Sequence, residues 1–237
     1  MSEDSIQFQP PSAERVAARA IILSAVSCRG FIEKDANNPK AEDLRQRVYS
    51  WLREIGVYDE AEEHECKILS TPLGSLQEKS VVNASWKSEG MVVLAWALGK
   101  VSLPDYEKEC EPSEIANTLG FLNDRISTPL ANPHLLSYSD IEYWADAYLT
   151  LHWRLRQYHL NPVAINFETY VEACTWGPLS LAEIELVDGD LAIAGARLDR
   201  VDESTVRNLI SITQERHQAL NWLLGEESIY SQVTTDT

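Results

Sequence analysis

The stretch MVVLAWAL, residues 91–98, is the strongest indication of the fold that we expect for this chain. Every position in it is apolar, so a helix formed here has no face for water and must have neighbours on all sides. It closes the longer segment SLQEKSVVNASWKSEGMVVLAWALG, residues 75–99, which predicts either one long helix or two helices joined near residues 83–85. We therefore expect a helical protein with this segment at its structural centre.

Further helices are predicted on both sides of this centre, because apolar residues recur there at helical spacing. The first is expected to begin after Ser12, a good N-cap residue, and to stop at Gly30. A short helix is expected to start at Pro112 or Ser113, after an acidic loop. The remaining predicted helices lie in EDLRQRVYSWLREIG (42–56), DEAEEHECKILS (59–70), SYSDIEYWADAYLTLHWRLRQYHL (137–160) and ESTVRNLISITQERHQALNWLLG (203–225).

The pattern changes in LAEIELVDGDLAIAGARL, residues 181–198, where apolar and polar residues alternate on both sides of Asp188-Gly189. Such alternation around Asp-Gly is typical of a two-stranded hairpin, here expected at about residues 179–198. The predicted fold is mainly α: a single-domain multi-helix bundle with a small antiparallel β-hairpin before the C-terminal helix. We expect a disordered or extended lead at 1–11, the helical domain at 12–230 and a polar tail at 231–237.

Two distant stretches share a pattern: EGMVVLAWALG (89–99) and ERHQALNWLLG (215–225) have Glu, Leu, Trp, Leu and Gly at the same offsets. Any buried helix that ends at a glycine needs such a pattern, so we interpret the similarity as the same packing solution used twice. A carboxylate near an apolar helix must reach water, a cation or a backbone N–H. We expect Glu89 and Glu215 to have structural roles, with acid–base chemistry as the alternative.

The composition narrows the classes of partner. The 237 residues carry 37 acidic and 20 basic side chains, a formal charge of −17, which argues against nucleic acid and anionic membranes and favours a basic protein. Four widely spaced cysteines and a beginning without the plan of a signal peptide indicate the cytoplasm. The longest apolar runs are shorter than the roughly 20 residues that a membrane-spanning helix needs.

Glu215-Arg216-His217 is the most reaction-like cluster in the chain, since it combines a base, a cation and an imidazole. Adjacent residues on a helix do not face one another, however, so a partly buried structural histidine is the preferred interpretation of His217. His152 is the remaining candidate for proton transfer. We expect no metal and no cofactor, because ligand spacings and the common nucleotide and hydrolase motifs are missing from the sequence.

Acidic runs are the candidate partner-binding residues. Such runs are usually only solvated faces, but they can also form docking surfaces for a cationic partner. The candidates are Asp59, Glu60, Glu62 and Glu63 in one run and Asp105, Glu107 and Glu109 in the other. Among the seven tryptophans, most of which should be core, Trp86 and Trp176 are the likeliest to be exposed.

Several stretches together resemble a known bacterial family, the one catalogued as domain of unknown function 4272. They are SWKSEGMVVLAWALGKV, DIEYWADAYLTLHWRLRQ, DLAIAGARL, QERHQALNWLLG and the closing TTDT. The family pattern favours an aromatic residue where this chain has Gln218. The resemblance extends from about residue 14 to the C-terminus, implies a mainly helical fold, and carries over no catalytic residues.

Three functional hypotheses follow from these observations. The first is a non-catalytic cytoplasmic protein-binding module, most concretely an immunity protein that neutralises a basic toxin. The alternative is an enzyme of unknown class with Glu89, Glu215, His217 and His152 in an interhelical pocket. The third is a structural subunit of a larger assembly, for which a large exposed apolar patch would be the sign.

Overall fold

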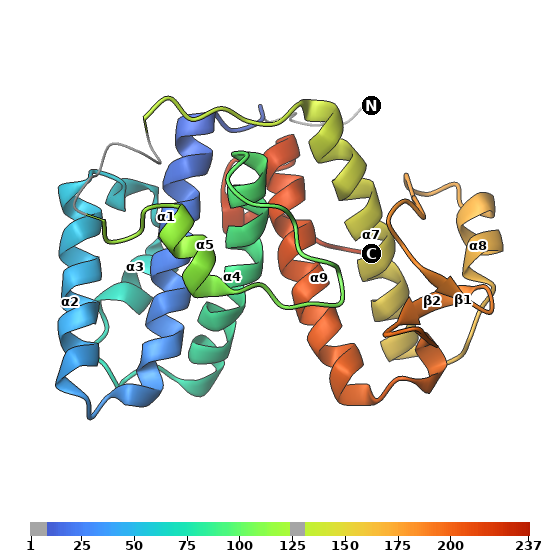
Figure 1. Cartoon of the computed structure of the whole chain (residues 1–237), viewed down its shortest axis with the longest axis horizontal. Helices are drawn as coiled ribbons and strands as arrows, with labels where there is room; N and C mark the ends of the chain where they lie inside the picture. Colours follow the sequence, from blue (N-terminus) through green and yellow to red (C-terminus); the bar gives the residue numbers. More distant parts are fainter. Residues whose placement is uncertain (1–8, 124–130) are drawn as a thin grey trace, which may run out of the picture. The chain divides into compact units, whose positions relative to one another are not determined.

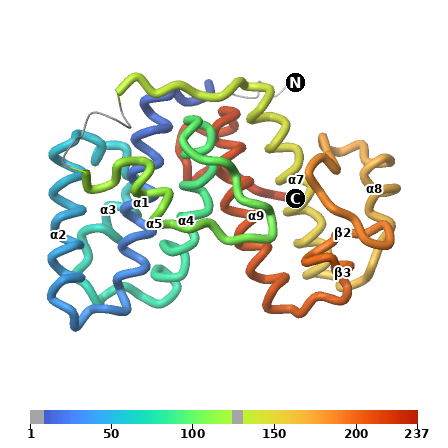
Figure 2. The backbone as a smooth tube through the Cα atoms, viewed as in Figure 1, coloured from blue at the N-terminus to red at the C-terminus, as the bar shows by residue number. Residues whose placement is uncertain are grey.

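The computed structural model describes residues 9–123 and 131–237 and divides the chain into two compact units (Figures 1 and 2). The N-terminal unit comprises Pro11–Leu103 and Cys110–Leu136. The C-terminal unit comprises Met1–Pro10, Pro104–Glu109 and Ser137–Thr237. The predicted extended lead at 1–11 falls largely on residues 1–8, which lie outside the described residues. The expectation that the chain forms a single domain stays a prediction.

The N-terminal unit is built on two long helices that pack along each other, α1 (Ala13–Ile32) and α4 (Glu78–Ala97) (Figure 1). Smaller helices complete this unit: α2 (Pro39–Glu54), α3 (Glu63–Ser70) and α5 (Pro112–Thr118). Short 3-10 turns at Glu33–Asp35 and Tyr58–Glu60 precede α2 and α3. The three shorter helices of this unit are thus arranged around the α1–α4 pair.

The all-apolar stretch lies where its composition predicts. Residues 91–98 are all buried, and Ser24 of α1 donates a 2.9 Å hydrogen bond to the sulfur of Met91. Of the two possibilities for this segment, the single long helix is the observed one. It ends as expected, with Gly99 at a φ of +66° that side chains rarely adopt.

The first helix begins as predicted but does not stop at Gly30. The Ser12 side chain caps it by accepting a hydrogen bond from the backbone N–H of Arg15. The helix continues to Ile32, and Gly30 is buried inside it. A Cβ added at Gly30 would lie 2.8 Å from the backbone nitrogen of Ser85 and 3.1 Å from the Cβ of Ala84. The glycine is therefore a contact point between two helices rather than a helix end.

The C-terminal unit is built on a second pair of long helices, α7 (Tyr138–Leu160) and α9 (Glu203–Leu224). The short helix α8 (Phe167–Ala173) and the small sheet follow α7 in sequence and lie on the side of α7 away from α9 (Figure 1). The sequence pattern did not predict α8, which is only two turns long. Gly225 closes α9 with a φ of +83°, as its position in the sequence predicts.

The sheet contains three short antiparallel strands instead of the expected two: β1 (Leu186–Val187), β2 (Asp190–Ile193) and β3 (Ala196–Arg197). Leu186 pairs with Leu191 across the predicted Asp188-Gly189 turn. A second turn of the same kind, at Ala194-Gly195, returns the chain so that Ile193 pairs with Ala196. Both turns have two consecutive residues at positive φ, which fits tight hairpin geometry.

The mainly α class and the small antiparallel sheet before the C-terminal helix are confirmed. The residues after α9 are more structured than a polar tail suggests, because Tyr230 and Val233 are buried and a 3-10 turn forms at Tyr230–Gln232. Within residues 9–123 and 131–237, no helix combines the length and the apolar character that crossing a membrane requires.

Candidate functional site

The C-terminal unit brings together the two histidines that the sequence offers for acid–base chemistry. His152 on α7 and His217 on α9 are 2% and 3% exposed, and their Nδ1 atoms are 3.3 Å apart. Burial lowers the pKa of His152 to about 4, with a contribution from Arg156, and lowers the pKa of His217 to about 3, with a contribution from His152. Both rings are therefore neutral at pH 7, and one donates to the other across the helix pair.

Arg216, between the two other members of the Glu-Arg-His cluster, is fully buried and serves the fold. Its guanidinium donates to the Tyr148 hydroxyl at 2.8 Å and to the backbone carbonyl of Lys108 at 2.6 Å. It also donates to the carbonyls of Pro104 and Asp105 at 3.3 and 3.2 Å. Because four acceptors surround one cation, Arg216 holds the backbone of residues 104–108 against α7 and α9.

This segment, residues 104–109, carries one of the two predicted acidic runs, and two further contacts attach it to the sheet. The buried Tyr106 donates to the carbonyl of Ala192 at 2.9 Å, and the Glu107 carboxylate accepts the N–H of Ala194 at 2.8 Å. Burial and the neighbouring carboxylates of Glu107 and Glu185 raise the pKa of Tyr106, so its hydroxyl stays protonated. Asp105 and Glu109 are exposed.

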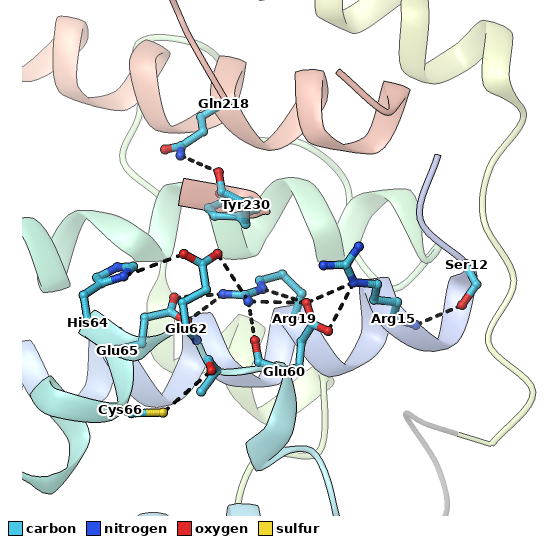
Figure 3. Close-up of polar contacts among 11 residues, drawn as sticks. Ser12, Arg15, Arg19, Glu60, Glu62, His64, Glu65, Cys66, Gln218 and Tyr230 are labelled. Atoms are coloured by element: carbon cyan, nitrogen blue, oxygen red, sulfur yellow. Dashed lines mark hydrogen bonds and ion pairs between the residues drawn. The ribbon is translucent and has the colours of Figure 1, made fainter. Parts of the chain in front are cut away.

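The other acidic run surrounds a buried arginine in the N-terminal unit (Figure 3). Arg19 donates to both oxygens of Glu65, at 2.9 and 2.7 Å, and lies 3.3 Å from Glu60 and 3.5 Å from Glu62. Burial alone would lower the pKa of Arg19, but the three carboxylates outweigh it and raise the pKa. Glu60 and Glu62, two of the predicted docking residues, are thus engaged inside the unit.

Asp59 and Glu63 belong to the same run but have exposed side chains. Glu63 is the first residue of α3. The side chain of its neighbour Glu62 accepts the backbone N–H of Glu65, and the Glu65 carboxylate in turn accepts the backbone N–H of Glu62 at 2.8 Å. The acidic character of this stretch therefore has a local structural cause, since carboxylates satisfy the free N–H groups of a helix N-terminus. Its docking role stays a prediction for the exposed pair.

Glu89, the remaining candidate, is buried in the N-terminal unit. Its carboxylate accepts the backbone N–H of Cys110 at 2.9 Å, and the Cys110 thiol donates to the carbonyl of Ser88 at 3.3 Å. These contacts hold the start of the 110–136 segment on α4. Glu215, its counterpart in the second copy of the pattern, is only half-buried on α9. The two equivalent glutamates therefore lie in different environments.

A fully buried ion pair in the C-terminal unit escaped the sequence analysis. Arg154 of α7 donates to both carboxylate oxygens of Asp190, at 2.7 and 2.6 Å, and the N–H of Ile165 donates to the same carboxylate at 3.1 Å. The pair joins the sheet to the long helix. Its one visible signal is Asp190 itself, an acidic residue at the start of an apolar strand, where a carboxylate needs a cation.

The described residues contain a small cavity of about 10 Å³ in the N-terminal unit, between α1, α2 and α3. It is lined by Ala25, Cys28, Arg29, Ile32, Arg45, Val48 and Leu69. This volume accommodates at most one water molecule. None of the candidate catalytic or partner-binding residues lines it. In residues 9–123 and 131–237, no group of three histidine, cysteine, aspartate or glutamate side chains has the arrangement of a metal site.

Side-chain amides of α9 attach the segment that follows this helix. Gln218 donates from its side-chain amide to the carbonyl of Tyr230 at 2.9 Å (Figure 3). The Asn221 amide likewise donates to the carbonyl of Thr234 at 3.3 Å. Side chains of α9 thus hold the chain that follows the helix.

Comparison with known proteins yields one relationship. The model of the family described as "Domain of unknown function (DUF4272)" matches residues 1–171. No curated protein and no solved structure matches this chain. The matched region includes the whole α1–α4 pair and α7, whereas the sheet and α9 follow it in sequence. Because the match covers well over half of the chain, the protein belongs to the DUF4272 family.

Proposed function

We propose that the protein is a non-catalytic binding module of the bacterial cytoplasm whose partner is a basic protein. The most concrete form of this proposal is an immunity protein that neutralises a basic toxin. Recognition of a basic protein is favoured by a surface of complementary charge.

The observation that carries the proposal is the unequal distribution of charge between the two units. The C-terminal unit contains 21 acidic and 7 basic residues, a formal charge of −14, whereas the N-terminal unit contains 16 and 13, a charge of −3. One unit thus accounts for most of the net charge. A concentrated negative potential accelerates association with a cationic protein and disfavours anionic partners.

The acidic segment 104–109 supports the same proposal because its backbone is held in place. Arg216 binds three of its carbonyls, and Tyr106 and Glu107 attach it to the sheet. Asp105 and Glu109 can therefore meet a partner without a loss of backbone entropy, which favours affinity. We take this segment as the primary docking surface.

The alternative, an enzyme that uses Glu89, Glu215, His217 and His152, has less support. The two histidines are buried, paired with each other and neutral, and the carboxylate of Glu89 accepts a backbone N–H. A general acid or base must have access to substrate and a pKa near the working pH. The contact of 3.3 Å between the imidazoles is the observation that keeps this alternative worth testing.

The test is affinity capture from a lysate of the source organism with two charge-matched variants. Asp105→Asn/Glu107→Gln/Glu109→Gln removes three charges from the segment, and the control Asp35→Asn/Asp43→Asn/Glu54→Gln removes three exposed charges from the N-terminal unit. We expect the wild type and the control to retain one basic protein in stoichiometric amount at about 50 mM salt, and to lose it near 300 mM. The segment variant should retain at least about ten-fold less of this basic protein than the wild type.

Retention of a basic protein that does not depend on salt would contradict the electrostatic mechanism. Retention of a small molecule or metal ion, with no protein, would contradict the binding-module proposal and favour the enzyme. To test the immunity role itself, the captured protein is expressed alone and together with this chain. Growth inhibition that this chain relieves is the expected result.

A further inference from the structure

Four aromatic side chains form a cluster where α8 and the following loop meet α7. Trp153 of α7 stacks on Tyr170 of α8, with ring centres 4.2 Å apart and planes 14° apart, and is nearly parallel to Phe167 at 5.9 Å. Trp176, three residues after α8, lies 6.2 Å from Trp153 at an angle of 47°. Phe167 is the buried base of the cluster, and Trp153 is half-buried above it.

The outer members of this cluster face water. Tyr170 is 37% exposed and Trp176 is 50% exposed, as the sequence predicts for Trp176. The indole N–H of Trp176 donates to the Tyr170 hydroxyl at 3.2 Å, which holds the two rings relative to each other. Aromatic surface that is both held and exposed is typical of a recognition surface, because its ordering entropy is already lost.

The cluster lies in the part of the molecule where exposed apolar side chains gather. Among the described residues, nine large apolar side chains are exposed, and seven of them belong to the C-terminal unit. They are Tyr138, Tyr143, Leu160, Val163, Tyr170, Trp176 and Ile229. The more acidic of the two units thus also carries more of the exposed large apolar side chains. This combination suits a cation with an aliphatic or planar group.

The segment that carries Tyr170 and Trp176 is acidic. Residues 157–196 contain six acidic residues and no lysine or arginine. Asp190 and Asp188 pair with Arg154 and Arg200, whereas Glu168 and Glu172, on either side of Tyr170 in the sequence, are exposed. On α7, a stripe at spacings of four, three, four and three residues runs from Glu142 through Asp146, Leu149 and Trp153 to Arg156, so it carries two carboxylates and one cation. Leu149 lies against Gly177, the neighbour of Trp176.

We infer that the exposed rings of Tyr170 and Trp176, supported by Trp153, bind an arginine side chain of the basic partner. A guanidinium is planar, weakly hydrated and able to stack on an aromatic face, and the net negative charge of the unit, with exposed Glu168 and Glu172 next to Tyr170 in the sequence, complements its charge. The same charge disfavours anionic ligands. The inference rests on the proposed function only in taking the partner to be a basic protein.

Arginine is favoured over lysine for a physical reason. The ammonium group of lysine is compact and strongly hydrated, and it does not stack. Electrostatic attraction alone treats the two cations alike, so a preference for arginine separates this surface from general attraction by the −14 charge of the unit.

The test uses fluorescein-labelled nona-arginine and nona-lysine peptides as probes of the full-length protein. Binding is followed by fluorescence anisotropy at about 50 mM salt. The variant is Trp176→Ala, and the matched control is Phe31→Ala, which truncates a similarly exposed aromatic ring (47%) in the N-terminal unit. Two-dimensional NMR of the indole N–H groups gives a second readout, in which the Trp176 signal is identified by its loss in the variant.

We expect the wild type and Phe31→Ala to bind nona-arginine more tightly than nona-lysine, and the Trp176 indole signal to shift on titration. Trp176→Ala should weaken nona-arginine binding about two- to five-fold and remove the preference over nona-lysine. Equal binding of nona-arginine by Trp176→Ala and Phe31→Ala would overturn the arginine site, while the basic-partner proposal would stand. Failure of the wild type to bind either peptide would overturn both, and an unshifted Trp176 signal would overturn the site alone.

Discussion

Arg216 and the two neighbouring histidines illustrate how single residues that look reactive serve the fold. Four oxygens surround the Arg216 guanidinium, and the His152–His217 contact joins α7 to α9. A buried cation or imidazole is tolerated only when its polar atoms are paired. These residues therefore specify which segments meet in the C-terminal unit.

The buried histidine pair predicts an acid-sensitive stability. The folded-state pKa values of about 4 and 3 lie below the ordinary value of 6.5, so the unfolded chain binds more protons between these limits. Stability is therefore complete above pH 6.5 and is lost progressively as the pH falls from 6.5 to the folded-state values. We expect the free energy of unfolding, measured with urea, to fall by on the order of 2–4 kcal/mol between pH 7 and pH 5 because of this pair.

The variant His152→Gln/His217→Gln should lose this part of the pH dependence, whereas His159→Gln, an exposed histidine on the same helix, should keep it. Equal pH dependence in the wild type and the double variant would show that the imidazoles are not the groups that titrate.

At the scale of elements, the two long helix pairs obtain their contacts in different ways. The α1–α4 pair approaches closely at small residues, with Gly30 against Ala84 and Ser85. In the C-terminal unit, buried polar groups connect the elements: the histidines join α7 to α9, and Arg154 with Asp190 joins α7 to the sheet. Close packing tolerates little change in volume, and buried ion pairs tolerate little change in charge.

The α1–α4 contact predicts that Gly30→Ala destabilises the protein although alanine favours helices. The new methyl group would lie 2.8 Å from the backbone nitrogen of Ser85, so the helices must separate locally. We expect a loss of about 1–3 kcal/mol in urea unfolding. For comparison, Gly177→Ala places a methyl group at an ordinary 3.7 Å from Leu149 and should change stability by less than about 0.5 kcal/mol. A Gly30→Ala protein as stable as the wild type would mean that the helices can move apart freely.

At the scale of the whole molecule, the path of the chain links the two units. It passes from one to the other after Pro10, Leu103, Glu109 and Leu136. Residues 104–109 belong to the C-terminal unit and are held there by Arg216, yet both of their chain neighbours belong to the N-terminal unit. We therefore expect unfolding of one unit to disturb the chain segments of the other to which it is covalently joined.

This connectivity, together with the single domain predicted from the sequence, leads us to expect one cooperative unfolding transition. Far-UV circular dichroism, which follows the helices, and near-UV circular dichroism, which follows aromatic packing, should give coincident urea curves. Two separated transitions would instead identify the units as independent domains.

All of the described helices except α8, the turn at Asp188-Gly189 and the glycine ends at Gly99 and Gly225 could be predicted from the sequence, because periodicity and local turn chemistry act within a few residues. The end of α1 could not, since a glycine that closes a helix and a glycine that admits a neighbouring helix look the same in one dimension. The acidic character was likewise visible in the composition. Of the two tryptophans predicted to be the likeliest exposed, Trp176 is exposed and Trp86 is half-buried.

Which charged residues are engaged inside the protein depends on the tertiary structure. Arg19 gathers Glu60, Glu62 and Glu65 across more than 40 residues of sequence, and Arg154 finds Asp190 at a separation of 36. The helical class, the position of the apolar centre and the acidic character of the chain follow from the sequence alone. Pairing between distant residues depends on how the elements pack, and packing is set by contacts that no local pattern contains.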